Sequence, residues 1–519
     1  MTGVFACVCG KAFTTKAAAA GLPASTGAGH AEAVKDLCSG DGVSRVIEAV
    51  REHRIDRIVL AGCPAIERAG LVAAVAAAAG IPAPHAAFLL LHEGTTRAAA
   101  APAIRRTVTA LEAMPGFETR SWKPVPDVLV IGAGPAGLEA ARSLAGLGHP
   151  VTVIDRSAAA EGAAAAGAKA SGIDVRSSTT LSGFDGFPGS FAARLQGPAG
   201  VEDRSFGAAI VATGLELAGP ARPPFVPGKI VPLPGLSAHL AGLSLRELPK
   251  SLAIVLDLEI DEGRASCDAA YRLALEALRK HRAAVTLLAR DAKVASLPLN
   301  QAYDDAREAG VTILKYTGAP VVRTGGAGES AVTIVARDSI TGADVKVSCD
   351  LAAVSPWGLG SPADAKLAEV LGLDLDALCR FQDNSSRLLP AATNRQGVFA
   401  VGACRGETWL PAVLRDARAA ALEAHALLAP RTLSVDTAHV VVDGDKCVLC
   451  LTCVRSCPFR AMGIDAADRR ASSRAELCRR CGVCAGECPA QAITLPAWSD
   501  PIVLGLAAPA TRVSAGAKA

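Results

Sequence analysis

The sequence is poor in aromatic residues and has almost no excess of charge of one sign. Only 4% of its 519 residues are aromatic, and 53 basic residues stand against 50 acidic ones, which leaves a net charge of +3. Proteins that bind nucleic acid use a strong positive field and stacking aromatic side chains. The composition therefore argues against nucleic acid as a partner.

Long hydrophobic runs are also missing. Half of the residues are hydrophobic, but most of the excess is alanine, and the longest apolar run, 71–91, is broken by Gly80, Pro82, Pro84 and His85. A membrane helix needs a longer uninterrupted stretch. The segment Met1–Gly10 lacks the basic and apolar regions of a signal peptide. We therefore expect a cytoplasmic chain with no membrane span and several domains.

Cysteine, by contrast, is abundant. The chain has 16 cysteines, and without an export signal such a number indicates metal or redox chemistry rather than disulfides. Eight of the 16 lie within residues 447–488, in "CVLCLTCVRSCP" and "CRRCGVCAGECP". Both stretches follow C-x2-C-x2-C-x3-C-P, the pattern of bacterial ferredoxins with two [4Fe-4S] clusters.

In that pattern the fourth cysteine of each run binds the cluster of the other run. The first predicted ligand set is Cys447, Cys450, Cys453 and Cys488, and the second is Cys478, Cys481, Cys484 and Cys457. The alternatives are a zinc-binding domain, which usually pairs two C-x2-C knuckles, and thiols without metal. We predict an α+β ferredoxin domain at 436–497, followed by a flexible tail at 498–519.

Residues 126–156 predict a dinucleotide-binding turn. A buried strand leads into Gly132-x-Gly134-x-x-Gly137, then an alanine-rich helix and a second strand that ends at Asp155. The glycines permit a tight turn, close approach of the backbone to a pyrophosphate, and close packing of helix on strand. The predicted cofactor-binding residues here are Gly132, Gly134, Pro135, Ala136, Gly137, Asp155 and Arg156.

Two later stretches favour FAD over NAD. "VATG" brings Ala212, Thr213 and Gly214 to the end of a strand, and "VFAVGA" ends in Gly402 and Ala403. These stretches resemble FAD-contact motifs of flavoproteins with two dinucleotide-binding domains, such as thioredoxin reductase. By this resemblance the FAD-binding domain has two parts, 125–248 and 356–430, and a pyridine-nucleotide-like domain is inserted at 249–355.

The inserted domain lacks the glycines that a nicotinamide cofactor needs. After the strand "SLAIVL" come Asp257, Glu259, Asp261 and Glu262 at the place where a pyrophosphate would lie, and only Gly263 permits close approach. Like charges oppose each other there. We expect a domain that keeps the fold without the ligand.

At the amino end, expected strands and helices alternate along the sequence, which predicts a small α/β domain over 1–120. We expect strands at 3–8, 57–62 and 86–91 and helices at 43–53 and 67–79. Cys9 and Cys63 each follow the carboxyl end of a strand, Cys7 faces the same side as Cys9, and Cys38 precedes a helix. From spacing alone, these four cysteines are either metal ligands or buried thiols.

Taken in order along the chain, six stretches resemble the A-type subunit of heterodisulfide reductase and its bacterial relatives. They are "GVFACVCG", "DLCSGDG", "VLAGCP", "VLVIGAGPAGLEAA", "TNRQGVFAVGAC" and the ferredoxin pair. The resemblance implies a third [4Fe-4S] cluster on Cys7, Cys9, Cys38 and Cys63, and an FAD core with a thioredoxin-reductase-like fold. It also implies an oxidoreductase subunit whose substrate site lies on another chain of an oligomeric complex. The implied partners are subunits like heterodisulfide reductase B and C, electron donors of the hydrogenase or dehydrogenase type, and ferredoxin.

Departures from that family limit what the resemblance implies. The turn that carries a lysine in the family reads "GETWLP" here, with Thr408 in its place, and Cys267, Cys349 and Cys379 are scattered. Simple electron relay is therefore a safer expectation than flavin-based bifurcation. No catalytic acid or base stands out, and His85, His92 and His239 are expected to be structural or exposed. Two alternatives remain: an NAD(P)H-dependent ferredoxin-type oxidoreductase resembling the glutamate synthase small subunit, and a scaffold that contains FAD and clusters.

Overall fold

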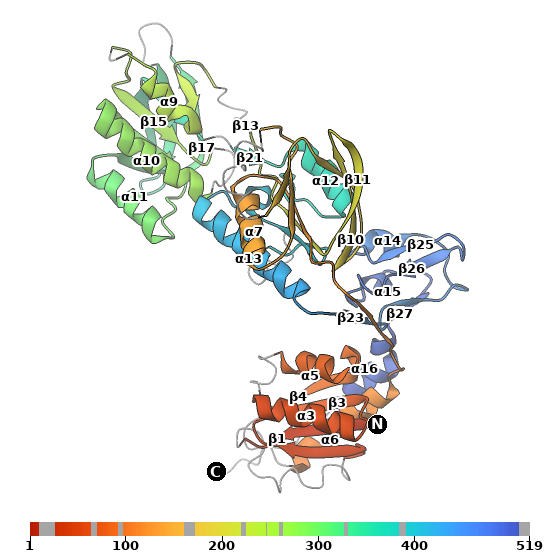
Figure 1. The fold of residues 1–519 in the computed structure, drawn as a ribbon. Helices are drawn as coiled ribbons and strands as arrows, with labels where there is room; N and C mark the ends of the chain where they lie inside the picture. Colours follow the sequence, from red (N-terminus) through yellow and green to blue (C-terminus); the bar gives the residue numbers. More distant parts are fainter. Residues whose placement is uncertain are drawn as a thin grey trace, which may run out of the picture. The chain divides into compact units, whose positions relative to one another are not determined.

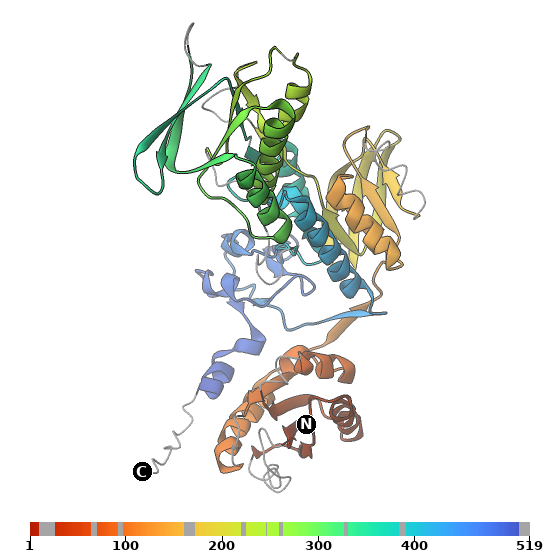
Figure 2. The same cartoon turned by 90° about the vertical axis from the view of Figure 1, so that its left-hand side faces the viewer.

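The computed structural model describes residues 1–9, 26–63, 70–91, 97–159, 172–218, 225–244, 246–258, 263–325, 331–355, 357–382 and 391–507. The chain divides into two compact units, one made of Met1–Lys123 with Thr432–Ala519 and the other of Pro124–Arg431 (Figures 1 and 2). Together they contain α/β domains and a small α+β ferredoxin-like domain, which confirms the predicted fold class. The expected limits of the individual domains stay predictions.

The amino-terminal domain is a four-stranded parallel sheet with the strand order β2-β1-β3-β4. Its elements are β1 (Thr2–Cys7), β2 (His30–Val34), α3 (Gly40–Glu52), β3 (Arg57–Gly62), α5 (Leu71–Ala79), β4 (Ala86–Leu90) and α6 (Arg97–Ala113). Apolar residues of α3 and α5 cover one face and those of α6 cover the other, so every residue of β1 is buried. A parallel sheet covered on both faces reads as a continuous apolar strand. The strand β2 was not expected from sequence.

The same unit contains the ferredoxin-like part. Its first strand pairs with a strand of the amino-terminal part in an antiparallel ribbon. Strand β5 (Thr119–Trp122) pairs with β23 (Leu433–Asp436). The remaining elements are β24 (Val441–Val442), α14 (Thr452–Ser456), β25 (Met462–Asp465), β26 (Arg470–Ser473), α15 (Val483–Gly486) and β27 (Ile493–Thr494). Their small core contains two of the eight ferredoxin cysteines, Cys453 and Cys484, and four more pack against it.

The tail differs from expectation over its first residues. Instead of a flexible segment from residue 498, Asp500–Ala507 form helix α16, which packs against α6. Ile502 is 1% exposed in this contact, and the burial of such an apolar side chain favours the ordered helix. Residues 508–519 of the expected tail lie outside the described residues.

In the second unit, the flavin-type domain is built on a five-stranded parallel sheet with the order β22-β12-β6-β7-β8. These strands are β6 (Val128–Ile131), β7 (Val151–Ile154), β8 (Asp174–Arg176), β12 (Ala208–Val211) and β22 (Val398–Ala400). Helices α7 (Pro135–Gly146) and α13 (Leu410–Leu428) share one core, and several of its alanines are fully buried, among them Ala140, Ala141, Ala417 and Ala421. The alanine-rich composition thus lets these two helices pack closely against each other and the sheet.

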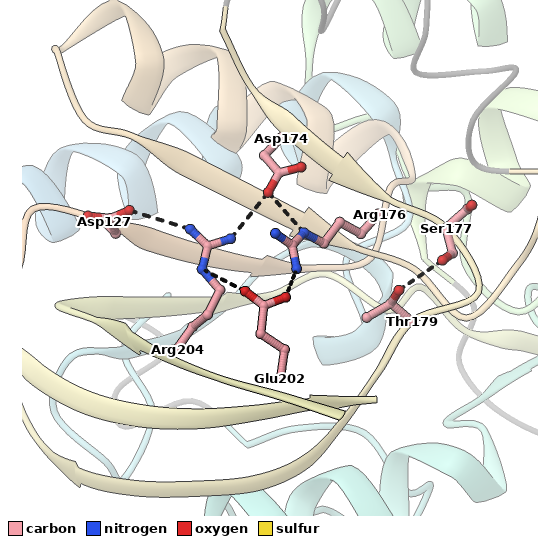
Figure 3. A network of polar contacts seen from close by, with 7 residues as sticks. All are labelled: Asp127, Asp174, Arg176, Ser177, Thr179, Glu202 and Arg204. Atoms are coloured by element: carbon pink, nitrogen blue, oxygen red, sulfur yellow. Dashed lines mark hydrogen bonds and ion pairs between the residues drawn. The ribbon is translucent and has the colours of Figure 1, made fainter. Parts of the chain in front are cut away.

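The opposite face of this sheet packs against an antiparallel hairpin sheet of β9 (Thr180–Phe187), β10 (Ser190–Gly197) and β11 (Gly200–Phe206), and against α12 (Pro362–Leu371). A network of charges ties β11 to β8 (Figure 3). Arg176 and Arg204 both contact Asp174, at 2.9 and 3.2 Å, and both reach Glu202. The hairpin sheet is therefore fixed to the parallel sheet by shared carboxylates as well as by apolar packing.

The inserted domain has a seven-stranded sheet with the order β14-β20-β15-β16-β17-β18-β19. Its strands are β14 (Ile230–Pro232), β15 (Ser251–Val255), β16 (Ala284–Ala289), β17 (Thr312–Thr324), β18 (Val332–Asp338), β19 (Asp344–Cys349) and β20 (Leu351–Val354). The helices α9 (Leu236–Ala241), α10 (Arg264–His281) and α11 (Leu297–Glu308) share one core with it. A two-stranded ribbon of β13 (Glu216–Ala218) and β21 (Trp357–Leu359) connects it to the flavin-type domain.

Short 3-10 helices complete the described structure. They span Ala83–His85 (η1), Leu233–Gly235 (η3), Gly402–Arg405 (η4) and Pro496–Trp498 (η5). No helix among the residues described above has the length and apolar character that crossing a membrane requires.

Candidate functional site

The glycine-rich turn joins β6 to α7 and meets the geometry that a dinucleotide needs. Gly132 has φ +112°, a conformation that favours glycine, and a Cβ there would collide with the carbonyl of Ala212. A Cβ at Gly137 would collide with the carbonyl oxygen of Gly132. Pro135 opens α7 directly after Gly134. The free N–H groups at this helix end are therefore available to a phosphate.

Asp155 has a structural task that the sequence did not reveal. Its carboxylate accepts hydrogen bonds from the backbone N–H of Ala133, at 2.7 Å, and of Ser157, also at 2.7 Å. The first bond holds the glycine-rich turn against the end of β7. A carboxylate oxygen can accept more than one hydrogen bond, so these two bonds leave room for a ribose hydroxyl. The contact between Asp155 and a ribose hydroxyl stays a prediction.

A cavity of about 530 Å³ opens beside this turn. Of the predicted cofactor residues, Gly132, Asp155, Arg156 and Thr213 line it. The hydroxyl of Thr213 is buried there beside the carboxyl of Asp364, where it offsets part of the rise in pKa that burial causes, although the two make no hydrogen bond of ordinary length and angle. A buried hydroxyl in this state, beside a helix amino end, suits a polar ligand group, and the volume lies within the range of small-molecule and cofactor sites. The residues thus fit a bound dinucleotide such as FAD.

The far wall of the cavity consists of residues that sequence reasoning missed. They come from the segment before and within β9, from β10 and from α12: Thr179, Thr180, Leu181, Ser182, Gln196, Ala363, Asp364, Lys366, Leu367 and Val370. Burial raises the pKa of Asp364, whose side chain also accepts a hydrogen bond from the N–H of Ser361. These positions carry no motif, since they approach the turn only through the packing of two sheets.

Arg156 connects the cavity to the ribbon that leads into the inserted domain. Its guanidinium donates to Ser361, at 3.1 Å, and to Glu216, at 3.2 Å. Ser361 begins α12 as its N-cap, and Glu216 opens β13. The predicted cofactor residue Arg156 therefore also bonds to both segments that connect the flavin-type domain with the inserted domain.

Gly402 and Ala403 lie at the other side of the turn. Gly402 has φ +73°, and a Cβ there would be 3.0 Å from the Cβ of Ala136 on α7. The next residue along, Cys404, is fully buried; this burial raises its pKa to about 12, and its thiol donates to the carbonyls of Val401 and Val211. Cys404 is therefore a core thiol. Four other predicted cofactor residues do not line the cavity: Pro135, Ala136, Gly214 and Ala403.

In the ferredoxin-like part, each predicted ligand set lines its own small cavity. One cavity is lined by Cys447, Cys450, Cys453 and Cys488, and the other is lined by Cys457, Cys478, Cys481 and Cys484. The structure thus brings together cysteines from both runs in the exchanged arrangement that the spacing predicts.

The two cysteine loops repeat the same backbone. Leu449 and Arg480 have φ of +52° and +55°, and Leu451 and Gly482 have φ of +61° and +81°. The fourth cysteines match as well, since the N–H groups of Ala461 and Ala492 each donate to the sulfur of Cys457 or Cys488 at 3.3 Å. Hydrogen bonds to the sulfurs are a feature of cluster sites.

Burial raises the pKa of Cys484 to about 11. Binding to iron would then displace the thiol proton, because the thiolate is the metal ligand. No group of three or more His, Cys, Asp or Glu in the described part of the chain is arranged to hold a single metal ion. A cubane has four separate iron corners for its thiolates, so this finding does not bear on a cluster.

The four amino-terminal cysteines lie at the carboxyl edge of the sheet. Cys7 ends β1, Cys63 directly follows β3, and Cys38 directly precedes Ser39, the N-cap of α3. The strand order reverses between β1 and β3, which is where open α/β sheets bind ligands. Cys7 and Cys63 are buried and Cys38 is exposed, while burial and the neighbouring Cys9 raise the pKa of Cys7 to about 11. Residues 10–25 and 64–69, on either side, lie outside the described residues.

The turn after the first strand of the inserted domain carries a buried carboxylate. Asp257 follows β15 with φ +58° and is 0% exposed. Its carboxylate accepts a hydrogen bond from the N–H of Arg290 and lies 3.8 Å from the ammonium of Lys293. Glu259, Asp261 and Glu262 lie outside the described residues. Leu256 directly follows β15, as Gly132 directly follows β6, and Asp257 is the next residue of this turn. Side chains therefore stand where a dinucleotide turn would have its glycine.

Other singled-out residues have no part in these sites. Cys267 and Cys349 are buried, and Cys379 is exposed. His85 is buried and bonds the carbonyl of Pro115, which agrees with a structural role. His239 lies in α9, and His92 falls outside the described residues.

Comparison with family models agrees with two of these sites. Residues 127–186 match the pyridine nucleotide-disulphide oxidoreductase family, and residues 439–489 match the 4Fe-4S dicluster domain. Among solved structures, thioredoxin reductase of T. acidophilum is 15% identical with a TM-score of 0.40, and the match covers 58% of this chain and 99% of that one. A TM-score this low adds nothing to the assignment.

Curated relatives share limited stretches. A protein of Archaeoglobus profundus that is described as similar to the A-type subunit of heterodisulfide reductase is 28% identical over 172 residues, which are 33% of this chain and 24% of that protein. The iron-sulfur A-type subunit of CoB–CoM heterodisulfide reductase from Methanocaldococcus jannaschii is 29% identical, over 24% of this chain and 19% of that protein. The matches thus span less than a quarter of these relatives' lengths. Within those limits the chain is similar to iron-sulfur flavoproteins of the heterodisulfide reductase A type.

Proposed function

We propose that the chain is an electron-transferring subunit of an oxidoreductase complex related to heterodisulfide reductase. It would bind FAD at the glycine-rich turn and pass electrons between FAD and [4Fe-4S] clusters. The single observation that carries the proposal is the pair of cavities lined by exchanged cysteine sets. The cavity beside the glycine-rich turn supports its flavin part. A chain that binds both FAD and iron-sulfur clusters is better suited to transferring electrons than to catalysis at a single site.

The protein's own part in such a reaction is to hold and orient. When bound, FAD would supply the change between two-electron and one-electron transfer. The amino end of α7 and the N–H groups after Gly132 would hold its pyrophosphate. Asp155 keeps that turn in place through Ala133, and the buried Thr213 hydroxyl beside Asp364 would present a polar group to the ligand. No catalytic acid or base is assigned.

The amino-terminal cysteines are proposed to hold a third cluster. Support comes from their common location at the carboxyl edge where the strand order reverses. A cluster there and two in the ferredoxin-like part would let this chain accept or deliver electrons at different domains. The partners would be other subunits of the complex, like heterodisulfide reductase B and C, a hydrogenase- or dehydrogenase-type donor, and ferredoxin.

The NAD(P)H-dependent alternative is less well supported. Asp257 lies in the turn that follows β15 in the inserted domain, and its buried carboxylate is paired with Lys293. A pyrophosphate approaching there would meet side chains instead of the glycine backbone that close approach requires. The scaffold alternative explains the paired cysteine cavities less directly, since one structural metal would suffice to stabilise a small domain.

Metal and flavin analysis of anaerobically purified protein tests the proposal. We expect one flavin and about twelve iron atoms per chain, four for each [4Fe-4S] cluster. Cys9→Ser should lower the iron by about four atoms and leave the flavin unchanged. The matched control is Cys379→Ser, because Cys379 is an exposed cysteine in no predicted ligand set.

Each outcome has a distinct meaning. About eight iron atoms in the wild type, or no loss in Cys9→Ser, would contradict the amino-terminal cluster alone. Absence of flavin together with full iron would contradict the relay itself.

A further inference from the structure

The amino end of α10 is covered by a turn of the flavin-type domain. Arg264, the first residue of α10, donates to the carboxylate of Glu407 at 2.6 Å. Its guanidinium also lies over the ring of Trp409, 4.8 Å from the centroid. A Cβ added at Gly263 would be 3.5 Å from the hydroxyl oxygen of Thr408. Three successive residues of one turn therefore meet the start of one helix.

This contact is largely sheltered from water. Arg264 and Glu407 have exposed side-chain fractions of 28% and 21%, and Trp409 is 8% exposed. Glu407 accepts a second hydrogen bond, from the N–H of Trp409 at 3.0 Å. A partly buried ion pair that is shared with a cation–π contact holds its geometry better than an isolated surface pair.

The place of the contact matters because α10 follows the first strand of a βαβ unit. Strand β15 lies between β20 and β16, so the strand order reverses between β15 and β20. A dinucleotide in such a fold lies at the carboxyl ends of these strands, with its pyrophosphate at the amino end of the helix. Here Ser355, which follows β20, bonds Ser266 of α10 at 3.2 Å, and Asp257 is buried after β15.

We propose that Arg264 is a positioning residue that fixes the inserted domain on the turn Glu407–Trp409 and thereby closes this crevice to a dinucleotide. The inserted domain is then a fixed support for the turn rather than a nucleotide carrier. The turn begins five residues after Gly402, which packs against α7. Holding it from the inserted domain steadies one side of the dinucleotide site. This inference stands whether or not the chain relays electrons.

Hydrogen exchange of the full-length, cofactor-loaded protein, read by mass spectrometry, tests the inference. Arg264→Gln should speed amide exchange about tenfold both in residues 264–270 and in residues 406–413, because loss of the ion pair and the cation–π contact frees both sides. Glu407→Gln should do the same, and the double variant should add little to either change. Arg264→Lys, which keeps the charge, should restore most of the protection.

Controls separate this effect from a general loss of stability. Arg272→Gln removes an exposed pair with Asp268 on the same helix and should leave both segments unchanged. If Arg264→Gln fails to fold, Glu407→Gln carries the test.

Unchanged exchange, or a change confined to one of the two segments, would overturn the positioning role. Protection of residues 264–270 in the wild type by added NADH or NADPH would overturn the closed crevice. Both readouts are independent of electron transfer, so failure of the proposed function would leave them intact.

Discussion

At the scale of single residues, Gly137 shows why the dinucleotide turn is sensitive to one methyl group. A Cβ there would meet the backbone of Gly132, which has no room to move because its own neighbour is the Ala212 carbonyl. We expect Gly137→Ala to lose most of its flavin and to unfold more easily. Flavin absorbance per protein and a denaturant titration measure both effects.

Gly146 provides the matched control on the same helix. Nothing lies within 4 Å of a Cβ at Gly146. Gly146→Ala should keep its flavin and gain up to about 1 kcal/mol in the free energy of unfolding, since alanine favours a helix. Equal flavin loss in both variants would contradict the role assigned to Gly137.

The positive charge of Arg479 distinguishes one of the two cysteine loops from the other. The repeated backbone makes Val448 its counterpart, and the first cavity is lined by no charged residue whereas Arg479 and Arg480 line the second. Arg480 is paired with Asp436 at 2.6 Å, but among the described residues no carboxylate forms an ion pair with Arg479. Nearby charge is one determinant of a cluster's reduction potential.

Arg479→Val should therefore make one cluster harder to reduce. At a fixed potential we expect the ratio of reduced to oxidised cluster to fall about tenfold, which is roughly 59 mV for one electron. A redox titration followed by electron paramagnetic resonance measures it. Arg469→Gln removes an exposed charge from the turn between β25 and β26 and should change neither potential; an equal shift in both variants would count against a local effect.

At the scale of elements, much of the amino-terminal domain could be predicted because its strands are continuous apolar runs. The strand expected at 57–62 spans Arg57–Gly62, and that expected at 86–91 spans Ala86–Leu90. Strand β2 could not be predicted, since "HAEAV" is short and only Val34 is buried. Its place at the sheet edge comes from pairing with β1, which is a tertiary effect.

The candidate flavin site also has a part that the sequence predicts and a part that it does not. The glycines and Asp155 carry a local motif, whereas Gln196 and Lys366 line the cavity only because the hairpin sheet and α12 pack against the parallel sheet. No spacing in the sequence links these residues. Motifs predict the part of a site that one βαβ unit builds, and packing decides the rest.

The charge network between β8 and β11 makes a prediction for this packing. Arg204 contacts Asp174, Glu202 and Asp127 and is 25% exposed. Arg204→Gln should lower the free energy of unfolding by about 1 kcal/mol, because a network outweighs an isolated surface pair. Arg194→Gln, which removes a single exposed pair with Asp203 on the same hairpin sheet, should have no measurable effect. Equal losses in a denaturant titration would contradict the network's role.

At the scale of the whole molecule, the chain combines a flavin-type core with a ferredoxin-like part and an inserted domain whose first turn has a buried Asp257. Asp257 and Arg264 are the residues that distinguish it from a nucleotide-binding domain, and the acidic stretch in the sequence predicted only the first of them. Arg264 could not be found in advance because its partners, Glu407 and Trp409, are distant in sequence.

The most direct test of the central claim is an anaerobic titration of the cofactor-loaded protein, followed at the flavin absorption band. We predict that neither NADH nor NADPH bleaches this band, whereas reduced ferredoxin does so rapidly. Rapid bleaching by either nicotinamide cofactor would contradict the relay, because electrons would then enter through the inserted domain, whose first turn carries the buried Asp257.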